Sequence, residues 1–304
     1  MDKPPFHPII LLIIGVISIS TSAIFVKLAG DAPSSIIAFY RLILAVVIMA
    51  PYVFVKHAAD LKEVAGRDWV WAAASGVFLA LHFILWFESL NYTSVASSVV
   101  LVSMQPIFAF IGTFLFFKER FSAGAVLSMI IAITGSVIIS WGDFQISGTA
   151  LYGDLLALGG AVMVTGYFLV GQSLRKRLSM TSYTFIVYLV ASVTLLIYNV
   201  GLNVPFGGYS GSQWLIYIGL AIIPTFFGHS LFNWSLRWVS ASKISMSILL
   251  EPVGAAILAF VLLGERISWS QWLGGSIVIF GLMLFIISTK KMMKPKLTHY
   301  SDKS

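Results

Sequence analysis

Two stretches, Ser94–Ser140 and Ser240–Ile286, decide how this sequence folds, because they repeat one pattern at a fixed distance. The first contains Gln105-Pro106, Lys118-Glu119-Arg120 and, in the apolar run that follows, Gly135. The second contains Glu251-Pro252, Gly264-Glu265-Arg266 and Gly281. Each proline, glutamate and glycine of the second stretch lies 146 residues after its counterpart. A repeat of this length predicts an internal duplication, in which each half of the chain builds a similar unit.

The composition is that of a membrane protein. Of the 304 residues, 59% are hydrophobic and only 10% are charged, whereas soluble domains are about 25% charged. The mean hydropathy of +0.94 leaves too little polar surface for a water-soluble globule. The net charge of +7 comes from short basic clusters between apolar runs, which suits membrane topology better than nucleic-acid binding. The absence of cysteine excludes disulfides and cysteine-ligated metals, and no cofactor is predicted.

Ten apolar segments follow one another along the chain. At about 1.5 Å per residue, each is long enough to cross a hydrocarbon core of roughly 30 Å. The connections between them are short and rich in turn residues, so no soluble domain is expected. The sequence therefore predicts an all-α integral membrane protein. The predicted spans are 8–29, 34–55, 68–90, 93–116, 121–141, 150–173, 180–200, 212–237, 240–263 and 268–289.

Positive charge alternates between successive connections. One side carries Lys3, Lys56, Lys62, Arg67, Lys118, Arg120, Arg175 to Arg177, Arg237, Lys243 and the tail from Lys290 to Lys303. The other side carries Asp31, Asp143, Asp154, Glu265 and Arg266. The positive-inside rule places the basic side and both termini in the cytoplasm of a plasma-membrane protein. Because each half contains five spans, an odd number, the second half is predicted to enter the membrane the opposite way up.

Two proline-centred spans, each ending at an acidic–basic pair, resemble those of the EamA-type family in the drug/metabolite transporter superfamily. They run from Pro106 to Glu119-Arg120 and from Pro252 to Glu265-Arg266, and Gly135, Gly281 and Arg41 add to the resemblance. It covers residues 9–290. The family implies ten transmembrane helices in a 5+5 inverted-topology repeat around a central cavity, with alternating access. Within the family, the chain is most similar to the branch of amino-acid and metabolite exporters.

The resemblance also implies the organisation of the chain. Residues 8–141 form the first repeat, 150–289 the second, and 290–304 a basic cytoplasmic tail. The expected partners are a small-molecule substrate and the lipid bilayer.

Small residues recur every four positions in the fifth span, at Gly124, Ser128, Ala132, Ser136 and Ser140. Such a face lets two helices approach closely, which favours packing within one monomer, with a homodimer as the alternative.

Ionisable residues inside the spans are the first candidates for function, because burying a charge in hydrocarbon costs on the order of 3 kcal/mol or more. Glu251 precedes Pro252, and Gln105 precedes Pro106. Each proline removes a backbone donor and is predicted to kink its helix, which exposes polar backbone to a cavity. A carboxylate at such a kink suits cation binding or proton coupling, and its alternative is a buried group that a neighbouring helix satisfies.

Further polar candidates lie in the other spans. Lys27, Arg41 and Glu88, toward the outer ends of their spans, suit a cluster for an anionic group such as an amino-acid carboxylate. The alternative is that Lys27 extends to the headgroups and Arg41 pairs with Glu88. His82 and His229, which the 146-residue offset relates to within one residue, are candidates for proton coupling, together with Glu88 and Glu251. Trp86, Tyr167 and Trp234 are the aromatic candidates for lining the cavity.

These patterns predict a secondary transporter that exports small amphipathic metabolites, amino acids in particular. Its alternative is a proton-coupled transporter of lipophilic or quaternary cations that uses Glu251 and the aromatic residues. An intramembrane enzyme is disfavoured, because the sequence contains neither HExxH nor GxSxG and its carboxylates lie on different spans. A structural or receptor role is also disfavoured, because such a protein does not require an inverted duplication.

Overall fold

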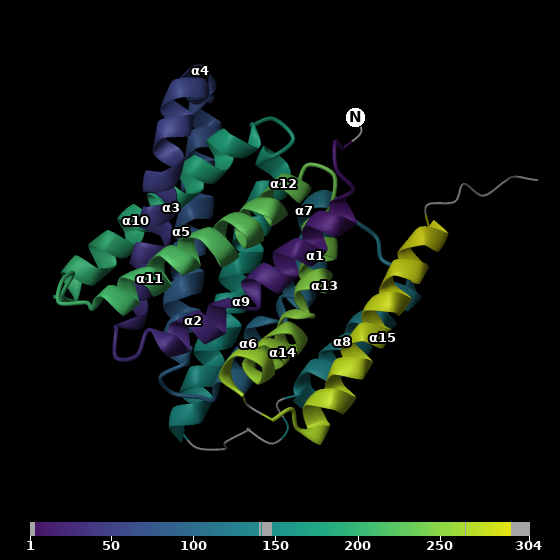
Figure 1. Cartoon of the computed structure of the whole chain (residues 1–304). Coiled ribbons are helices and arrows are strands. Elements are labelled where there is room, and N and C mark those ends of the chain that lie inside the picture. The colour runs from purple at the N-terminus through teal and green to yellow at the C-terminus, as the bar shows by residue number, and fades with distance from the viewer. Residues whose placement is uncertain (1–3, 140, 142–147, 265, 293–304) are drawn as a thin grey trace, which may run out of the picture.

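A computed structural model describes residues 4–139, 141, 148–264 and 266–292, and it is helical with short connections (Figure 1). Lys3, Ser140, Asp143, Glu265 and the basic tail from residue 293 onward lie outside the described residues. The first half contains α1 (Pro8–Ile19), α2 (Ser22–Leu28), α3 (Ser34–Lys56), α4 (Ala58–Lys62), α5 (Gly66–Ser89), α6 (Val95–Val102), α7 (Gln105–Phe117) and α8 (Ala123–Ile139). The second half contains α9 (Gly148–Leu174), α10 (Met180–Gly201), α11 (Gly211–Leu220), η1 (Ala221–Ser230), α12 (Leu231–Ser235), α13 (Ala241–Ile248), α14 (Glu251–Leu263) and α15 (Trp269–Met292).

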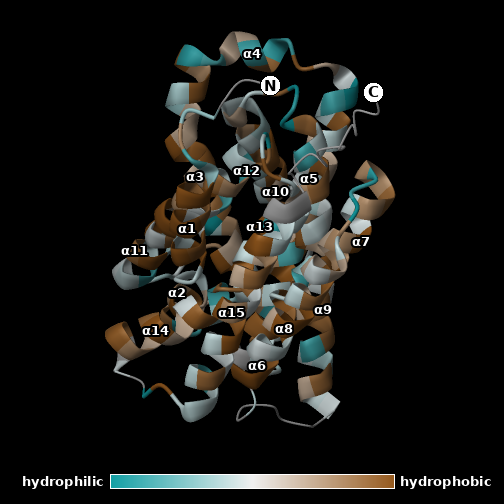
Figure 2. Ribbon diagram, turned by 90° about the vertical axis from the view of Figure 1, so that its right-hand side faces the viewer, coloured by the Kyte–Doolittle hydropathy of each residue, from teal (hydrophilic) through white to brown (hydrophobic). Residues whose placement is uncertain are grey.

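The predicted membrane architecture is confirmed. Among the residues described, nine helical stretches are long and apolar enough to cross a bilayer, and α8 is an apolar helix of 17 residues. Their outward faces carry large apolar side chains that are mostly exposed, such as Val55, Phe116 and Leu215. A water-soluble protein rarely exposes so much contiguous apolar surface, whereas lipid covers it at no cost. Figure 2 shows apolar residues along most of the bundle, with the polar ones gathered mainly toward α4.

The two halves have matching helices. Shifting α6 and α7 by 146 residues reproduces the bounds of α13 and α14, and the same shift places α3 on α10 and α8 on α15. The contacts are reciprocal as well. Helix α5 packs on α9 as α1 packs on η1, and α5 packs on α10 as η1 packs on α3. Such reciprocity is what an approximate two-fold axis between the halves produces.

Both proline-centred spans are interrupted immediately before the proline. Helix α6 ends at Val102 and α7 begins at Gln105, while α13 ends at Ile248 and α14 begins at Glu251. Proline cannot donate to the carbonyl four residues earlier, and those carbonyls belong to Val102 and Ile248. Each helix therefore ends where its hydrogen-bond ladder loses a donor.

The small-residue face of the fifth span packs inside the chain. Helices α8 and α15 lie side by side (Figure 1). A Cβ added at Gly135 would lie 2.7 Å from the carbonyl oxygen of Gly274, and one at Gly281 would lie 2.8 Å from the backbone nitrogen of Ala132. Glycine at these positions lets the two backbones touch.

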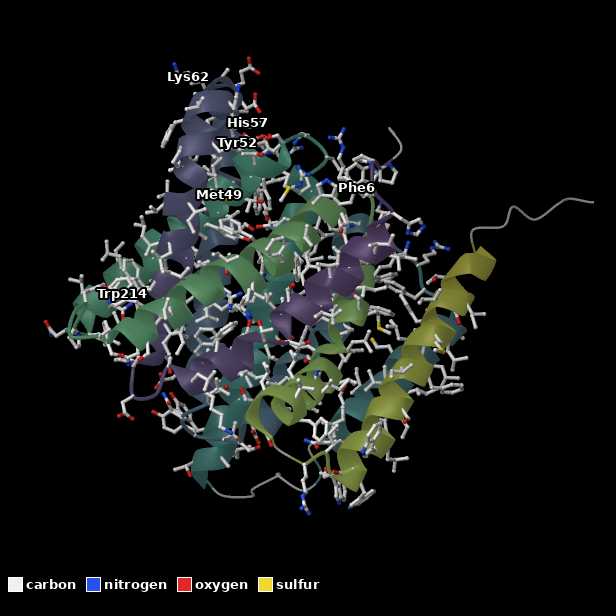
Figure 3. The ribbon with its side chains drawn as sticks, viewed as in Figure 1. Phe6, Met49, Tyr52, His57, Lys62 and Trp214 are labelled. Carbon is white, nitrogen blue, oxygen red and sulfur yellow. The ribbon has the colours of Figure 1, made fainter. Side chains whose placement is uncertain are left out.

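The chain starts and finishes at one end of the bundle. Helix α1 begins, and α15 ends, at the end where α4 lies (Figure 1). Phe6, His57 and Lys62 gather at this end (Figure 3). Lys62 belongs to the set of basic residues predicted to face the cytoplasm. The arrangement agrees with an even number of crossings.

Candidate functional site

A small cavity of about 30 Å³ lies where the broken helices meet. Three spans of each half contribute to its wall, namely those that contain α1–α2, α5 and α6–α7 in the first half and α9, η1–α12 and α13–α14 in the second. Its lining residues are Ile19, Ser22, His82, Trp86, Val102, Gln105, Val164, Phe168, His229, Phe232, Ile248 and Glu251. A cavity of this size holds about two water molecules.

The lining is symmetric under the repeat. Four pairs of lining residues are related by an offset of 146: Ser22 with Phe168, Trp86 with Phe232, Val102 with Ile248, and Gln105 with Glu251. The remaining two pairs, Ile19 with Val164 and His82 with His229, depart from that offset by one residue. In each of these two pairs, one residue lies on an irregular helix: Ile19 ends α1 at the α1–α2 break, and His229 lies in the π-helical η1. The cavity therefore lies between the two repeats, and its chemical asymmetry comes from substitutions at equivalent positions.

Glu251 and Gln105 face each other across this approximate symmetry. Both side chains are buried, with Glu251 6% exposed, and both begin the helices that follow the breaks. The Gln105 amide donates to Ser245 Oγ at 2.7 Å, which fixes its orientation. Among the described residues, no side chain donates a hydrogen bond to the Glu251 carboxylate, which is therefore free to bind a cation or a proton from the cavity.

The two histidines both line the cavity, with ring centroids 6.5 Å apart. His82 Nδ1 lies 2.9 Å from the carbonyl oxygen of Gly160. Because a carbonyl oxygen only accepts, Nδ1 carries the proton and Nε2 is the acceptor of the neutral ring. His229 Nδ1 is buried and has no hydrogen-bond partner among the described residues.

Trp86 joins this group from α5. Its ring stacks on His82 at 5.6 Å between centroids, and its Nε1 is a buried donor without a partner in the described part of the chain. Buried donors are nearly always hydrogen-bonded in folded proteins, so an unpaired donor beside a cavity indicates a place for a ligand or water. Trp86 and His229 thus line the same cavity, and each has one buried ring nitrogen without a hydrogen-bond partner in the described part of the chain.

Arg41 lies one layer behind the wall rather than on it. It is fully buried, its Nε donates to Thr225 Oγ1 at 2.8 Å, and its Nη1 donates to Ser22 Oγ at 3.4 Å. Its guanidinium lies 4.4 Å from the centre of the Phe83 ring. Arg41 and Glu251 are close enough for their charges to interact. Arg41 therefore supplies positive potential beside the carboxylate.

The proposed outer cluster does not form as a unit. Glu88 is half-buried and accepts a hydrogen bond from Asn91 Nδ2 at 3.2 Å, so Arg41 and Glu88 have different partners. Arg41 has turned toward Thr225 in the bundle interior. Lys27 is exposed in the last turn of α2.

Two aromatic candidates lie away from the cavity wall. Tyr167 is buried and donates to Asn233 Oδ1 at 2.6 Å, although its ring lies 6.0 Å from that of His229. Trp234 is half-buried and packs on Trp238 with ring centroids 4.3 Å apart. The position of a residue along its span does not tell whether its side chain lines the cavity, as that of Trp86 does. The direction of the side chain depends on how the helix is rotated in the bundle.

Several wall residues are absent from the sequence-based set of candidates, namely Ile19, Ser22, Val102, Val164, Phe168, Phe232 and Ile248. The 146-residue offset contained a signal for some of them. Once Trp86 is a candidate, the repeat points to Phe232. The others are apolar or small residues that look like ordinary membrane-helix positions.

The sequence pattern of the EamA-like transporter family matches residues 7–141 and again residues 151–287. The chain belongs to the EamA-like transporter family. The two matches correspond to the two sets of helices that share the cavity.

Curated relatives agree with this membership. The uncharacterized transporter YdfC of Bacillus subtilis is 25% identical over 96% of this chain and 94% of its own length. The uncharacterized transporter YxxF of the same organism is 25% identical over 84% of this chain and 82% of its own. An uncharacterized transporter of Archaeoglobus fulgidus is 23% identical over 90% and 94%. A solved crystal structure shares the EamA-like fold, with a TM-score of 0.80 at 15% identity over 94% of this chain and 99% of that one.

Proposed function

We propose that this transporter exports small amphipathic metabolites, amino acids in particular, across the plasma membrane. The observation that carries the proposal is the composition of the cavity wall. The carboxylate-bearing residue Glu251 shares the wall with Trp86 and His229, each of which has a ring nitrogen without a partner among the described residues. The Glu251 carboxylate suits an ammonium group. The Trp86 N–H, and the His229 Nδ1 when it carries the proton, suit a carboxylate, so a zwitterion matches both sets.

The rest of the wall favours an apolar side chain on the cargo. Apart from Ser22, His82 and Gln105, the other lining residues are aliphatic or are phenylalanine: Ile19, Val102, Val164, Phe168, Phe232 and Ile248. Small-molecule sites commonly combine an apolar wall with a few polar groups that fix the orientation of the ligand. An amino acid with an aliphatic or aromatic side chain has this distribution of polarity.

The transport cycle follows from the duplication. Five spans in each half, an odd number, require the second half to cross the membrane in the opposite direction to the first, so we infer an inverted repeat. The basic connections place both termini in the cytoplasm. A cavity of about 30 Å³ is far smaller than an amino acid, so the halves must move apart to admit cargo. Rocking of the two repeats about the cavity opens it to each side in turn.

The oligomeric state that we propose is a monomer. The small-residue face of α8 is occupied by α15 of the same chain, so it is not available for a second copy. A homodimer would have to use another face.

The second candidate, export of a lipophilic or quaternary cation in exchange for protons, is favoured by one observation. Glu251 lies on the wall, whereas the buried Arg41, whose charge interacts with that of Glu251, is not among the lining residues. A cation over aromatic faces would need no anion-binding group.

A matched pair of compounds separates the two candidates. The purified protein is screened by thermal shift with leucine and with isopentylamine, which lacks only the carboxylate, and the stabilising compound is then followed as flux from sealed vesicles. A ligand that binds only the folded state raises its apparent stability by mass action. We expect leucine-like zwitterions to stabilise the protein and to be transported. Stabilisation and flux with the amine alone would favour the cation, and flux of neither would contradict both.

A further inference from the structure

The eighth span contains a ten-residue π-helical segment, η1, between the α-helical segments α11 and α12. Its counterpart in the first repeat, α5, is α-helical from Gly66 to Ser89. π-Helical turns are rare and occur frequently at functional sites, because each costs regular α-helical hydrogen bonds. The segment therefore needs a local cause and something that maintains it.

The local cause is Pro224. Proline has no backbone N–H, so it cannot donate to the carbonyl of Leu220, four residues earlier. That carbonyl instead accepts a hydrogen bond from the side chain of Thr225, five residues on, at 2.8 Å. The first repeat has Phe78 at the position equivalent to Pro224, and its helix stays regular.

Two neighbouring helices hold η1 from the side. Arg41 of α3 donates through Nε to the Thr225 hydroxyl at 2.8 Å. Tyr188 of α10 donates to the Thr225 carbonyl at 3.3 Å and lies within hydrogen-bond distance of Ser230 Oγ, at 3.0 Å. Thr225 is fully buried, so these bonds form without competition from water.

The consequence of the π-helical register reaches the cavity at His229. This residue lies four positions after Thr225 within η1 and lines the cavity. Its counterpart on the wall, His82, lies 147 residues earlier, whereas the lining pairs on regular helices are 146 residues apart. A change of helical register at Thr225 would rotate every side chain that follows it in the segment.

We propose that Arg41 is a positioning residue that holds η1 in its π-helical register through Thr225, and thereby keeps His229 on the cavity wall. The bond is charge-assisted, which makes it roughly twice as strong as one between neutral groups. This assigns a task to an arginine that is buried in the membrane interior yet does not line the cavity. The inference rests on the proposed function only in taking this cavity as the cargo site.

Chemical labelling tests the position of residue 229 directly. The chain has no cysteine, so His229→Cys creates a single reactive thiol in the full-length protein. Its rate of modification by the small water-soluble reagent methanethiosulfonate-ethylammonium is measured alone and combined with Arg41→Lys, Thr225→Val or Thr225→Ser. Arg41→Lys keeps the charge but removes Nε, and Thr225→Ser keeps the hydroxyl. We expect Arg41→Lys and Thr225→Val to slow the modification by about fivefold or more, and Thr225→Ser to restore it.

Thr113→Val is the matched control. Thr113 is a fully buried threonine whose hydroxyl donates to the carbonyl of Ala109 at 2.8 Å, and it has no arginine partner. We expect it to leave the rate unchanged. An unchanged rate in Arg41→Lys, or an equal slowing by Thr113→Val, would overturn the proposal. If Arg41→Lys does not fold, Arg41→Met, which removes both the donor and the buried charge, replaces it, and an unchanged rate in that protein overturns the proposal.

The labelling result is independent of transport. If leucine is not transported but the rates follow the expected order, the cargo assignment fails and the positioning role stands. If leucine is transported but the rates do not change, the positioning role fails and the cargo assignment stands.

Discussion

The two residues that precede the prolines, Gln105 and Glu251, occupy equivalent positions but have different tasks. The Gln105 amide is bound to Ser245, whereas the Glu251 carboxylate faces the cavity. An amide in one repeat and a carboxylate in the other leave one titratable acid at the approximate symmetry axis. We infer that this single acid is where protons and cargo compete.

Glu251→Gln tests this competition. The substitution keeps the size of the side chain and removes its titration, so efflux from proteoliposomes should lose its dependence on pH across the neutral range. Glu88→Gln is the control, because Glu88 is half-buried and bonded to Asn91 away from the cavity wall. Wild-type pH dependence in the Glu251→Gln protein would rule out the coupling role.

Trp86→Phe tests the unpartnered indole nitrogen. The substitution keeps an aromatic ring beside His82 but removes the donor, so the KM for a carboxylate-bearing cargo should rise about tenfold, the effect of one hydrogen bond to a charged group. Trp234→Phe, at a tryptophan that packs on Trp238, should leave the KM unchanged. Equal effects of the two substitutions in the flux assay would show that the indole nitrogen of Trp86 binds no cargo.

At the scale of helices, the two repeats end their proline-led helices in the same conformation. Lys118, which follows α7, has a φ of 55°, and Gly264, which follows α14, has a φ of 69°. The left-handed region is easy for glycine and costs other residues roughly 1 to 2 kcal/mol. The first repeat therefore stores strain at Lys118 that the second repeat avoids.

Lys118→Gly should relieve that strain. We expect the free energy of unfolding to rise by about 1 kcal/mol, which a thermal or chemical denaturation curve in detergent would measure. Lys176→Gly, just after α9, is a suitable comparison. It also removes one positive charge from a basic connection, but Lys176 does not have a positive φ. A lower stability of Lys118→Gly than of wild type would contradict the strain argument.

Glu119, next along the chain, joins the repeats. Its two carboxylate oxygens accept hydrogen bonds from Ser240 and Ser242, both at 3.0 Å, at the start of α13. Charge-assisted bonds at a helix N-terminus are favourable for an acid, so this contact closes the bundle on the side that carries α4.

Glu119→Gln should weaken this closure. A single cysteine introduced as Val102→Cys on the cavity wall should then react faster with a thiol reagent added from the side of α4. Glu63→Gln changes an exposed glutamate at the end of α4 and should leave the rate unchanged. A rate that is equal in all three proteins would mean that the contact does not control access.

At the scale of the whole molecule, we infer that the two repeats cross the membrane in opposite directions. Single cysteines at Arg120→Cys and Arg266→Cys sit at equivalent points of the two repeats. An impermeant thiol reagent applied to intact cells should label the second and not the first. Labelling of both from one side would contradict the inverted arrangement and, with it, the alternating-access cycle.

The sequence by itself determined the membrane class, the two repeats and the places where two helices break. These features depend on local properties, since hydropathy, span length and a missing proline donor act within a few turns of one helix. The offset between Pro106 and Pro252 was enough to relate whole helices, and the structure reproduces their bounds.

Only the tertiary structure decided which polar residues meet. It placed Arg41 against Thr225 rather than Glu88, brought Trp86 and His229 to one cavity, and turned Tyr167 toward Asn233. The direction in which a side chain points depends on how its helix is rotated about its own axis relative to its neighbours. A membrane helix that is apolar on every side does not specify that rotation. The π-helical register of η1 follows from one proline and from contacts with two distant helices, α3 and α10, and those contacts exist only once the bundle is packed.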